Sequence, residues 1–82
     1  MSRKFAFIGA GSFGFTRGLV RDLLTFPAFA DAEYALMDID PERLDFAKTA
    51  VEKIITAGHY PAKLTVTMDR EEALRNADGV VI

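Results

Sequence analysis

The chain has 82 residues, 50% of them hydrophobic and 27% charged, a mixture that is typical of one small globular domain rather than of a disordered segment. Ten basic and twelve acidic residues leave a formal net charge of −2, which gives no electrostatic reason to expect nucleic acid or an anionic membrane as a partner. The absence of cysteine excludes a disulfide framework and thiolate metal sites, and a single histidine, His59, makes a Ser-His-Asp triad difficult to build.

The first residues resemble a secretory signal at first sight, because Arg3 and Lys4 precede an apolar run over residues 5–15. No small-x-small cleavage site follows, the run contains three glycines, and residues 16–26 continue as an amphipathic helix. No stretch reaches the roughly 18 apolar residues that a membrane span needs. We therefore expect a soluble, cytoplasmic protein without a membrane partner.

The first half of the chain predicts two strands with a helix between them. Residues 4–8 are mostly apolar and stop at a glycine cluster, which is typical of a strand buried on both faces of a parallel sheet. Apolar side chains at helical spacing predict a helix over residues 16–26, which Pro27 ends. Residues 33–38 are the second predicted strand.

Asp40 and Pro41 predict the start of a second helix, with Asp40 as the N-cap and Pro41 at the first helical position. We expect this helix to end at Gly58, as a C′ residue. Its apolar stripe consists of Leu44, Ala47, Val51, Ile54 and Ile55.

Two more strands and a short helix complete the pattern. Residues 63–68 alternate between apolar and polar side chains, as a third strand does. Asp69 with Glu72 forms an acidic capping box for a short helix that we expect to reach Asn76. Residues 79–82 are the fourth predicted strand.

This alternation predicts an α/β fold with a parallel sheet in the strand order 3-2-1-4 and right-handed crossovers. An apolar last strand has no cover for both of its faces. We therefore expect residues 1–82 to be the N-terminal part of a longer chain.

Gly9, Gly11 and Gly14 fit the pattern G-x-G-x-x-G between the first strand and the first helix. Gly9 permits a tight turn, Gly11 lets a pyrophosphate approach the backbone, and Gly14 lets the helix pack on the strand. The amides around Ser12, Phe13 and Gly14 have no intrahelical partners, so with the helix dipole they form an anion site. Glycine-rich turns also occur merely for tight packing, but the flanking strand and helix indicate a dinucleotide-binding, Rossmann-type domain.

Asp38 follows Gly14 by 24 residues and ends the second predicted strand. A carboxylate there accepts hydrogen bonds from the adenosine ribose hydroxyls and repels a 2′-phosphate, which favours NAD over NADP. Asp40 competes for this role, although it is better explained as the helix cap. Arg43 is within reach of the adenine edge, but a solvated helix face explains it more simply.

No paired carboxylates and no nucleophile with a neighbouring base appear in the sequence, so we assign no catalytic residue. A lone histidine lacks partner ligands, and we expect His59 to lie on the surface without a metal role.

Three segments together resemble the N-terminus of glycoside hydrolase family 4: residues 7–16, residues 35–44 and residues 70–78. They read Phe-Ile-Gly-Ala-Gly-Ser-Phe-Gly-Phe-Thr, Ala-Leu-Met-Asp-Ile-Asp-Pro-Glu-Arg-Leu and Arg-Glu-Glu-Ala-Leu-Arg-Asn-Ala-Asp, and the resemblance covers essentially the whole chain. Within the family the chain is more similar to the α-galactosidase, α-glucosidase and α-galacturonidase branch. The branch that acts on 6-phosphoglycosides tends to carry a Gly-Gly-Gly-Ser loop followed by Tyr-Thr-Pro-Glu, which is absent here.

The resemblance implies an NAD- and Mn²⁺-dependent glycosidase that cleaves small α-glycosides, α-galactosides foremost. In such enzymes NAD⁺ oxidises the sugar at C3, a base removes the acidified C2 proton, and the glycosidic bond breaks by elimination, while Mn²⁺ polarises the C2 and C3 oxygens. The resemblance also implies that the full-length protein is a homo-oligomer. It implies further that the metal ligands and the catalytic base lie beyond Ile82, so that residues 1–82 alone would be inactive. The cofactor contacts that it implies are Gly9, Gly11, Ser12, Phe13, Gly14 and Asp38.

The same dinucleotide-binding pattern is compatible with two other functions. The chain is also compatible with the cofactor half of a lactate- or malate-type dehydrogenase, or with a nucleotide-sensing module that has no catalytic activity. A Cys and a His at metal-ligand positions would support the glycosidase, and an Asp/His proton relay would support the dehydrogenase. A short chain with neither would support the sensor.

Overall fold

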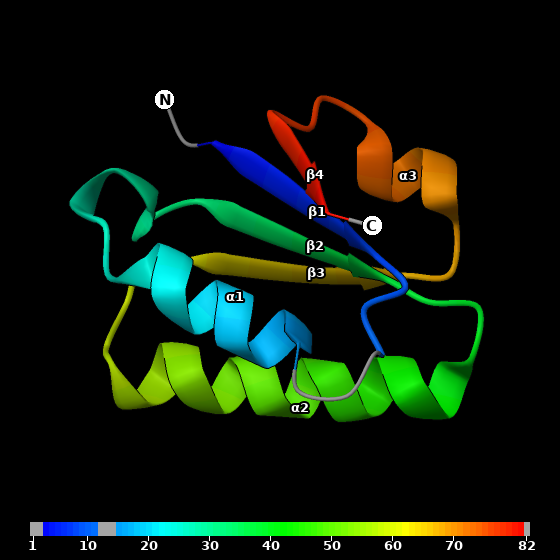
Figure 1. Cartoon of the computed structure of the whole chain (residues 1–82), viewed down its shortest axis with the longest axis horizontal. Coiled ribbons are helices and arrows are strands. Elements are labelled where there is room, and N and C mark those ends of the chain that lie inside the picture. Colours follow the sequence, from blue (N-terminus) through cyan, green and yellow to red (C-terminus); the bar gives the residue numbers. More distant parts are fainter. Residues whose placement is uncertain (1–2, 12–14, 82) are drawn as a thin grey trace.

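Strands and helices alternate along the chain (Figure 1). The structure is a computed structural model, and it describes residues 3–11 and 15–81. The elements follow in the order β1 (Lys4–Ile8), α1 (Phe15–Leu24), the 3-10 helix η1 (Pro27–Phe29), β2 (Glu33–Met37), α2 (Pro41–Ala57), β3 (Lys63–Thr67), α3 (Arg70–Leu74) and β4 (Gly79–Val81). Within these two ranges, no helix combines the length and the apolar character that crossing a bilayer requires.

The four strands form one parallel sheet in the order β3-β2-β1-β4, which confirms the predicted topology. Ala6 of β1 pairs with Ala35 of β2 on one side and with Val80 of β4 on the other. The strand order therefore reverses between β1 and β4, which lie side by side in the sheet.

Helices cover both faces of the sheet, as Figure 1 shows: α1 and α2 lie together on one face, and α3 lies on the other. The larger core lies under α1 and α2, where the buried side chains are Phe7, Val20, Leu24, Tyr34, Leu36, Leu44, Ala47 and Val51. The smaller core under α3 consists of Ala6, Met37 and Ala73, with Ile8 and Ala77 packed against it. Alternate residues of β1 and β2 therefore serve different cores.

Helix α2 begins as predicted. Oδ1 of Asp40 accepts hydrogen bonds from the amides of Glu42 (2.9 Å) and Arg43 (3.3 Å), and Pro41 occupies the first helical position. This cap fixes where the chain turns from the end of β2 into the helix.

The end of α2 differs from the prediction, because Gly58 is the C-cap with φ of −90° and is not a left-handed C′ residue. The positive φ falls instead on His59, at 54°. A Cβ on Gly58 would collide with the ring of Tyr60, with Cδ2 only 2.6 Å away. Glycine is therefore required here for the close approach of a ring and not for its φ.

Helix α3 is shorter than predicted, since it ends at Leu74 while Asn76 adopts a left-handed conformation with φ of 59°. Nζ of Lys4 donates to the carbonyls of Glu72 (3.2 Å) and Arg75 (2.7 Å), so a distant side chain satisfies carbonyl groups at the end of this helix. Asp69 caps the first turn by accepting from Glu71. The amide of Asp69 itself donates to Oγ1 of Thr67 (3.0 Å), where we had expected the Glu72 side chain as its partner.

Tyr34 predicts an alkaline limit to the stability of this fold. Its hydroxyl donates to the carbonyl of Phe29 (2.9 Å), and burial, followed by the negative charge of Asp31, raises its pKa from 10.0 to about 12. Because the pKa is higher in the folded state, the stabilisation is complete below pH 10 and is lost as the pH rises towards 12. Tyr34→Phe should cost about 1 kcal/mol at neutral pH and remove this part of the pH dependence.

Urea unfolding between pH 7 and pH 11.5, followed by circular dichroism, measures both effects. Tyr60→Phe is the matched control, because the side chain of Tyr60 is only partly buried. An alkaline loss of stability that is equally steep in Tyr34→Phe and in the unmodified protein would contradict this assignment.

Candidate functional site

The carboxyl ends of β1, β2 and β3 open onto a groove of about 730 Å³. Ligands of open α/β sheets bind outside the carboxyl ends of the strands, so this groove is the first candidate for a site. Ile39 and Met68 are 79% and 52% exposed and give it apolar surface. The lining residues are Ile8, Gly9, Met37, Asp38, Ile39, Met68, Asp69 and Arg70.

The turn after β1 is fastened to the end of β2 by backbone hydrogen bonds. The amides of Gly9 and Ala10 both donate to the carbonyl of Met37, each at 2.9 Å. Gly9 has φ of +74°, a conformation that glycine adopts without the steric cost of a Cβ. The tight turn that we predicted at Gly9 is therefore present, and it brings the glycine loop next to the end of β2.

Asp38 comes directly after β2 and joins this loop to the start of α2. Its side chain is only 7% exposed. Oδ2 accepts from the amide of Gly11 (2.8 Å), and Oδ1 accepts from the amide of Asp40 (2.9 Å). A carboxylate offers about four acceptor positions, so these two bonds leave capacity for other donors in the groove that Asp38 lines.

The surroundings of Asp38 keep its carboxyl group ionised. The hydrogen bond from Asp40 lowers its pKa most; burial opposes this, and the Gly11 amide and the positive charge of Arg43 lower the pKa further. The net direction is below the ordinary value of 3.8. At neutral pH the groove therefore contains a fixed negative charge with hydrogen-bond acceptors.

At Gly11 the glycine loop, the end of β2 and the first turn of α2 come into close contact. A Cβ at this position would lie 2.7 Å from Oδ2 of Asp38 and 3.2 Å from Cδ of Arg43, and it would collide with Cβ of Arg43. The absence of a side chain at Gly11 thus admits both neighbours to the loop. The contact of its stem with Gly11 is not predicted by the sequence, whereas the exposed head agrees with the predicted solvated helix face, since the side chain of Arg43 is 65% exposed.

One signal in the sequence points to Arg43. It lies in the first turn of α2, where the helix dipole disfavours a positive side chain, so its position is not explained by the stability of the helix.

Ser12, Phe13 and Gly14, which we predicted as diphosphate contacts, lie outside the described residues. His59 is exposed and follows the far end of α2, a 17-residue helix and so about 25 Å from the groove. Among residues 3–11 and 15–81, no three His, Asp or Glu side chains gather in a way that would hold a metal ion.

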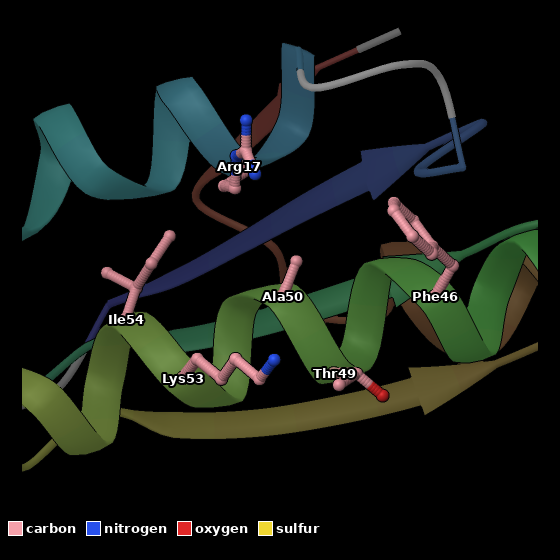
Figure 2. A pocket seen from close by; sticks show the side chains of 6 residues that line it. All are labelled: Arg17, Phe46, Thr49, Ala50, Lys53 and Ile54. Atoms are coloured by element: carbon pink, nitrogen blue, oxygen red, sulfur yellow. The ribbon is translucent and has the colours of Figure 1, made fainter.

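A second hollow, of about 330 Å³, lies between α1 and α2. Figure 2 shows Phe46, Ala50 and Ile54 on the side of α2 that faces Arg17 of α1; Thr49 and Lys53 complete the lining. The lining includes neither Asp38 nor a described residue of the glycine loop, so this hollow is separate from the groove.

The hydrogen bonds of Asp38 predict an acid-sensitive stability. Because its pKa is lowered in the folded state, the stabilisation is present above the ordinary value of 3.8 and is lost as the pH falls through the folded-state pKa. Asp38→Asn should lose this dependence and destabilise the protein by about 1–3 kcal/mol at neutral pH, since an amide cannot accept from both backbone donors equally well.

Urea unfolding between pH 2.5 and pH 7 tests this prediction. Asp45→Asn, an exposed change on the same helix as Arg43, is the matched control. Equal acid sensitivity in Asp38→Asn and in the unmodified protein would show that the carboxylate is not the group that titrates.

Comparison with known proteins agrees with the resemblance found in the sequence. The chain is 40% identical over 80 residues to an alpha-galactosidase of Rhizobium meliloti (strain 1021), an alignment that covers 98% of this chain and 16% of that protein. An alpha-galactosidase of Bacillus subtilis (strain 168) is 35% identical, with 96% of this chain and 18% of that protein covered. An alpha-glucosidase of Erwinia rhapontici is 32% identical, with 100% and 18% covered.

The chain thus spans less than a fifth of the length of these curated relatives. Residues 4–82 match the family model described as "Family 4 glycosyl hydrolase". That match includes β1, the glycine loop, Asp38 and every later element of the sheet. The chain belongs to the family 4 glycosyl hydrolases.

Proposed function

We propose that this chain is the NAD-binding portion of an α-glycosidase whose foremost substrates are α-galactosides. The observation that carries the proposal is the ionised, buried carboxylate of Asp38 at the mouth of a groove beside a glycine loop. The names of the three relatives, two alpha-galactosidases and one alpha-glucosidase, favour glycoside cleavage over a dehydrogenase or a nucleotide sensor.

The described residues fit the adenosine end of NAD. Asp38 has acceptor positions left for the ribose hydroxyls, which are hydrogen-bond donors. Ile39 and Met68 expose apolar surface suited to the flat face of adenine. Gly11 keeps the loop free of a side chain next to the carboxylate.

The same geometry supports NAD over NADP. A 2′-phosphate on the ribose would approach the negative charge of Asp38 in a place with little solvent screening, since that side chain is 7% exposed. Ribose hydroxyls, in contrast, donate to it. The charge of Asp38 therefore both attracts the preferred ribose and repels the phosphorylated one.

In this proposal the residues of the chain bind and orient, and the cofactor provides the redox chemistry. By the resemblance, NAD⁺ when bound would supply reversible hydride chemistry at C3 of the sugar, accepting the hydride so that C2 becomes acidic enough for elimination and returning it after water has added. Asp38 and the glycine loop would hold the adenosine end in place. The described residues offer no ligand set for the Mn²⁺ that the resemblance implies, so we assign the metal no residue here.

Gly11→Ala tests the cofactor site. The added methyl group would displace Asp38 and Arg43, so we expect at least about a tenfold loss of NAD⁺ affinity by calorimetry, with the far-ultraviolet circular dichroism retained. Gly18→Ala is the matched control, because a Cβ there meets nothing within 4 Å. Equal NAD⁺ affinity in the two variants would show that the loop is misassigned.

Activity of the intact protein tests the glycosidase. We expect hydrolysis of p-nitrophenyl α-galactoside to fall by at least about tenfold when NAD⁺ is stripped from the protein, and to return when NAD⁺ is added with Mn²⁺ and a reductant. p-Nitrophenyl β-galactoside is the control substrate for the anomeric preference. Cleavage that is indifferent to the supply and removal of NAD⁺ would contradict the proposal.

A further inference from the structure

We infer that Arg43 is a second determinant of cofactor choice: its guanidinium forms a latent site for a ribose 2′-phosphate, which the charge of Asp38 keeps closed. This inference rests on the proposed NAD-binding function and adds a residue to it. It follows from the position of Arg43, from the charges around it and from the exposure of its guanidinium.

The position of Arg43 is set by its contact with the glycine loop. Its aliphatic stem lies against Gly11, since a Cβ on Gly11 would collide with Cβ of Arg43 and lie 3.2 Å from Cδ. Oδ2 of Asp38 lies at the same point, 2.7 Å from that hypothetical Cβ. Arg43 at the start of α2 and Asp38 at the end of β2 thus both contact the loop at Gly11.

The head of Arg43 remains available. Nε lies 3.8 Å from Oδ2 of Asp40, and the two side chains are 65% and 47% exposed. A solvent-exposed ion pair of that length contributes little to stability, so a stronger anion would readily displace Asp40 from the guanidinium. The stem is fixed against Gly11 while the guanidinium is free to turn.

The helix gives no reason for a cation at this place. The first turn of α2 is already capped by Asp40, and the dipole there favours negative side chains. Lysine and arginine are common near the opposite end of helices, where α2 has no basic residue in its last turn. Arg43 is therefore located against the electrostatic preference of its own helix.

A 2′-phosphate would meet two opposite charges here. The ribose hydroxyls are expected at Asp38, and the stem of Arg43 lies beside the same loop residue, Gly11, so the guanidinium is within reach of a phosphate on the 2′-oxygen. The planar fork of arginine matches phosphate oxygens in two parallel hydrogen bonds. With Asp38 ionised the repulsion prevails, and without that charge Arg43 would bind the phosphate.

The test measures NAD⁺ and NADP⁺ affinities by calorimetry in the intact protein. Asp38→Asn should lower the ratio of the Kd for NADP⁺ to the Kd for NAD⁺. Adding Arg43→Gln to that variant should then weaken NADP⁺ by about tenfold or more while changing NAD⁺ by less than about threefold. Lys53→Gln is the matched control, since it removes the same charge from an exposed position on the same helix.

If Asp38→Asn does not fold, the comparison is made with Asp38 in place, by competition of NADP⁺ against bound NAD⁺. Arg43→Gln should again raise the Kd ratio of NADP⁺ to NAD⁺, and Lys53→Gln should not. An Arg43→Gln change that alters both affinities by the same factor overturns the inference, and so does an equal effect of Lys53→Gln. Failure of the unmodified protein to bind NAD⁺ would refute the proposed function and this inference together, whereas NAD⁺ binding with an unaltered ratio refutes the inference alone.

Discussion

One carboxylate links the glycine loop to the start of α2. Asp38 accepts from the amide of Gly11 in the first loop and from the amide of Asp40 at the start of α2. Without it, two half-buried backbone donors at the carboxyl end of the sheet would lack this acceptor, at a cost in stability. The relative positions of the glycine loop and of α2 therefore depend on a single ionised side chain.

In the proposed site, this dependence places a structural and a binding role on the same residue. The two hydrogen bonds hold the carboxylate in one orientation and favour its ionised form. A ligand then meets an acceptor that is already oriented and charged, so little reorganisation is required on binding. The carbonyl of Met37 reinforces the arrangement by accepting from both Gly9 and Ala10.

Most of the topology was predictable because it depends on local patterns. Alternating apolar runs, the cap at Asp40 and the proline after it specified β1, β2 and the start of α2, and the strand order 3-2-1-4 followed from the handedness of the crossovers. The errors concern contacts made by individual side chains, one with a distant segment and one with a residue two positions further along the chain. Helix α3 ends early where Lys4 bonds its carbonyls, and Gly58 is constrained by the ring of Tyr60; neither contact appears in a local pattern.

The candidate site likewise has a part that local patterns predicted and a part that they did not. The strand-glycine-helix context and the acid after β2 identified Gly9, Gly11 and Asp38, because the sequence states both the spacing and the chemistry. The proximity of Arg43 to Gly11 is a tertiary fact that depends on how α2 lies against the loop.

That proximity has a physical consequence for the way cofactor choice evolves in such a loop. A site that held Asp38 alone would need two changes to accept a phosphorylated ribose, namely the loss of a negative charge and the gain of a positive one. Here the positive charge is already in place, on a stem fixed against Gly11. If the proposed site binds NAD, its preference over NADP depends on one carboxylate, which also positions the loop. In the proposed site, selection for the loop geometry would thus preserve the cofactor preference, because replacing Asp38 even by Asn removes the charge together with one of the two oxygens that accept from the backbone.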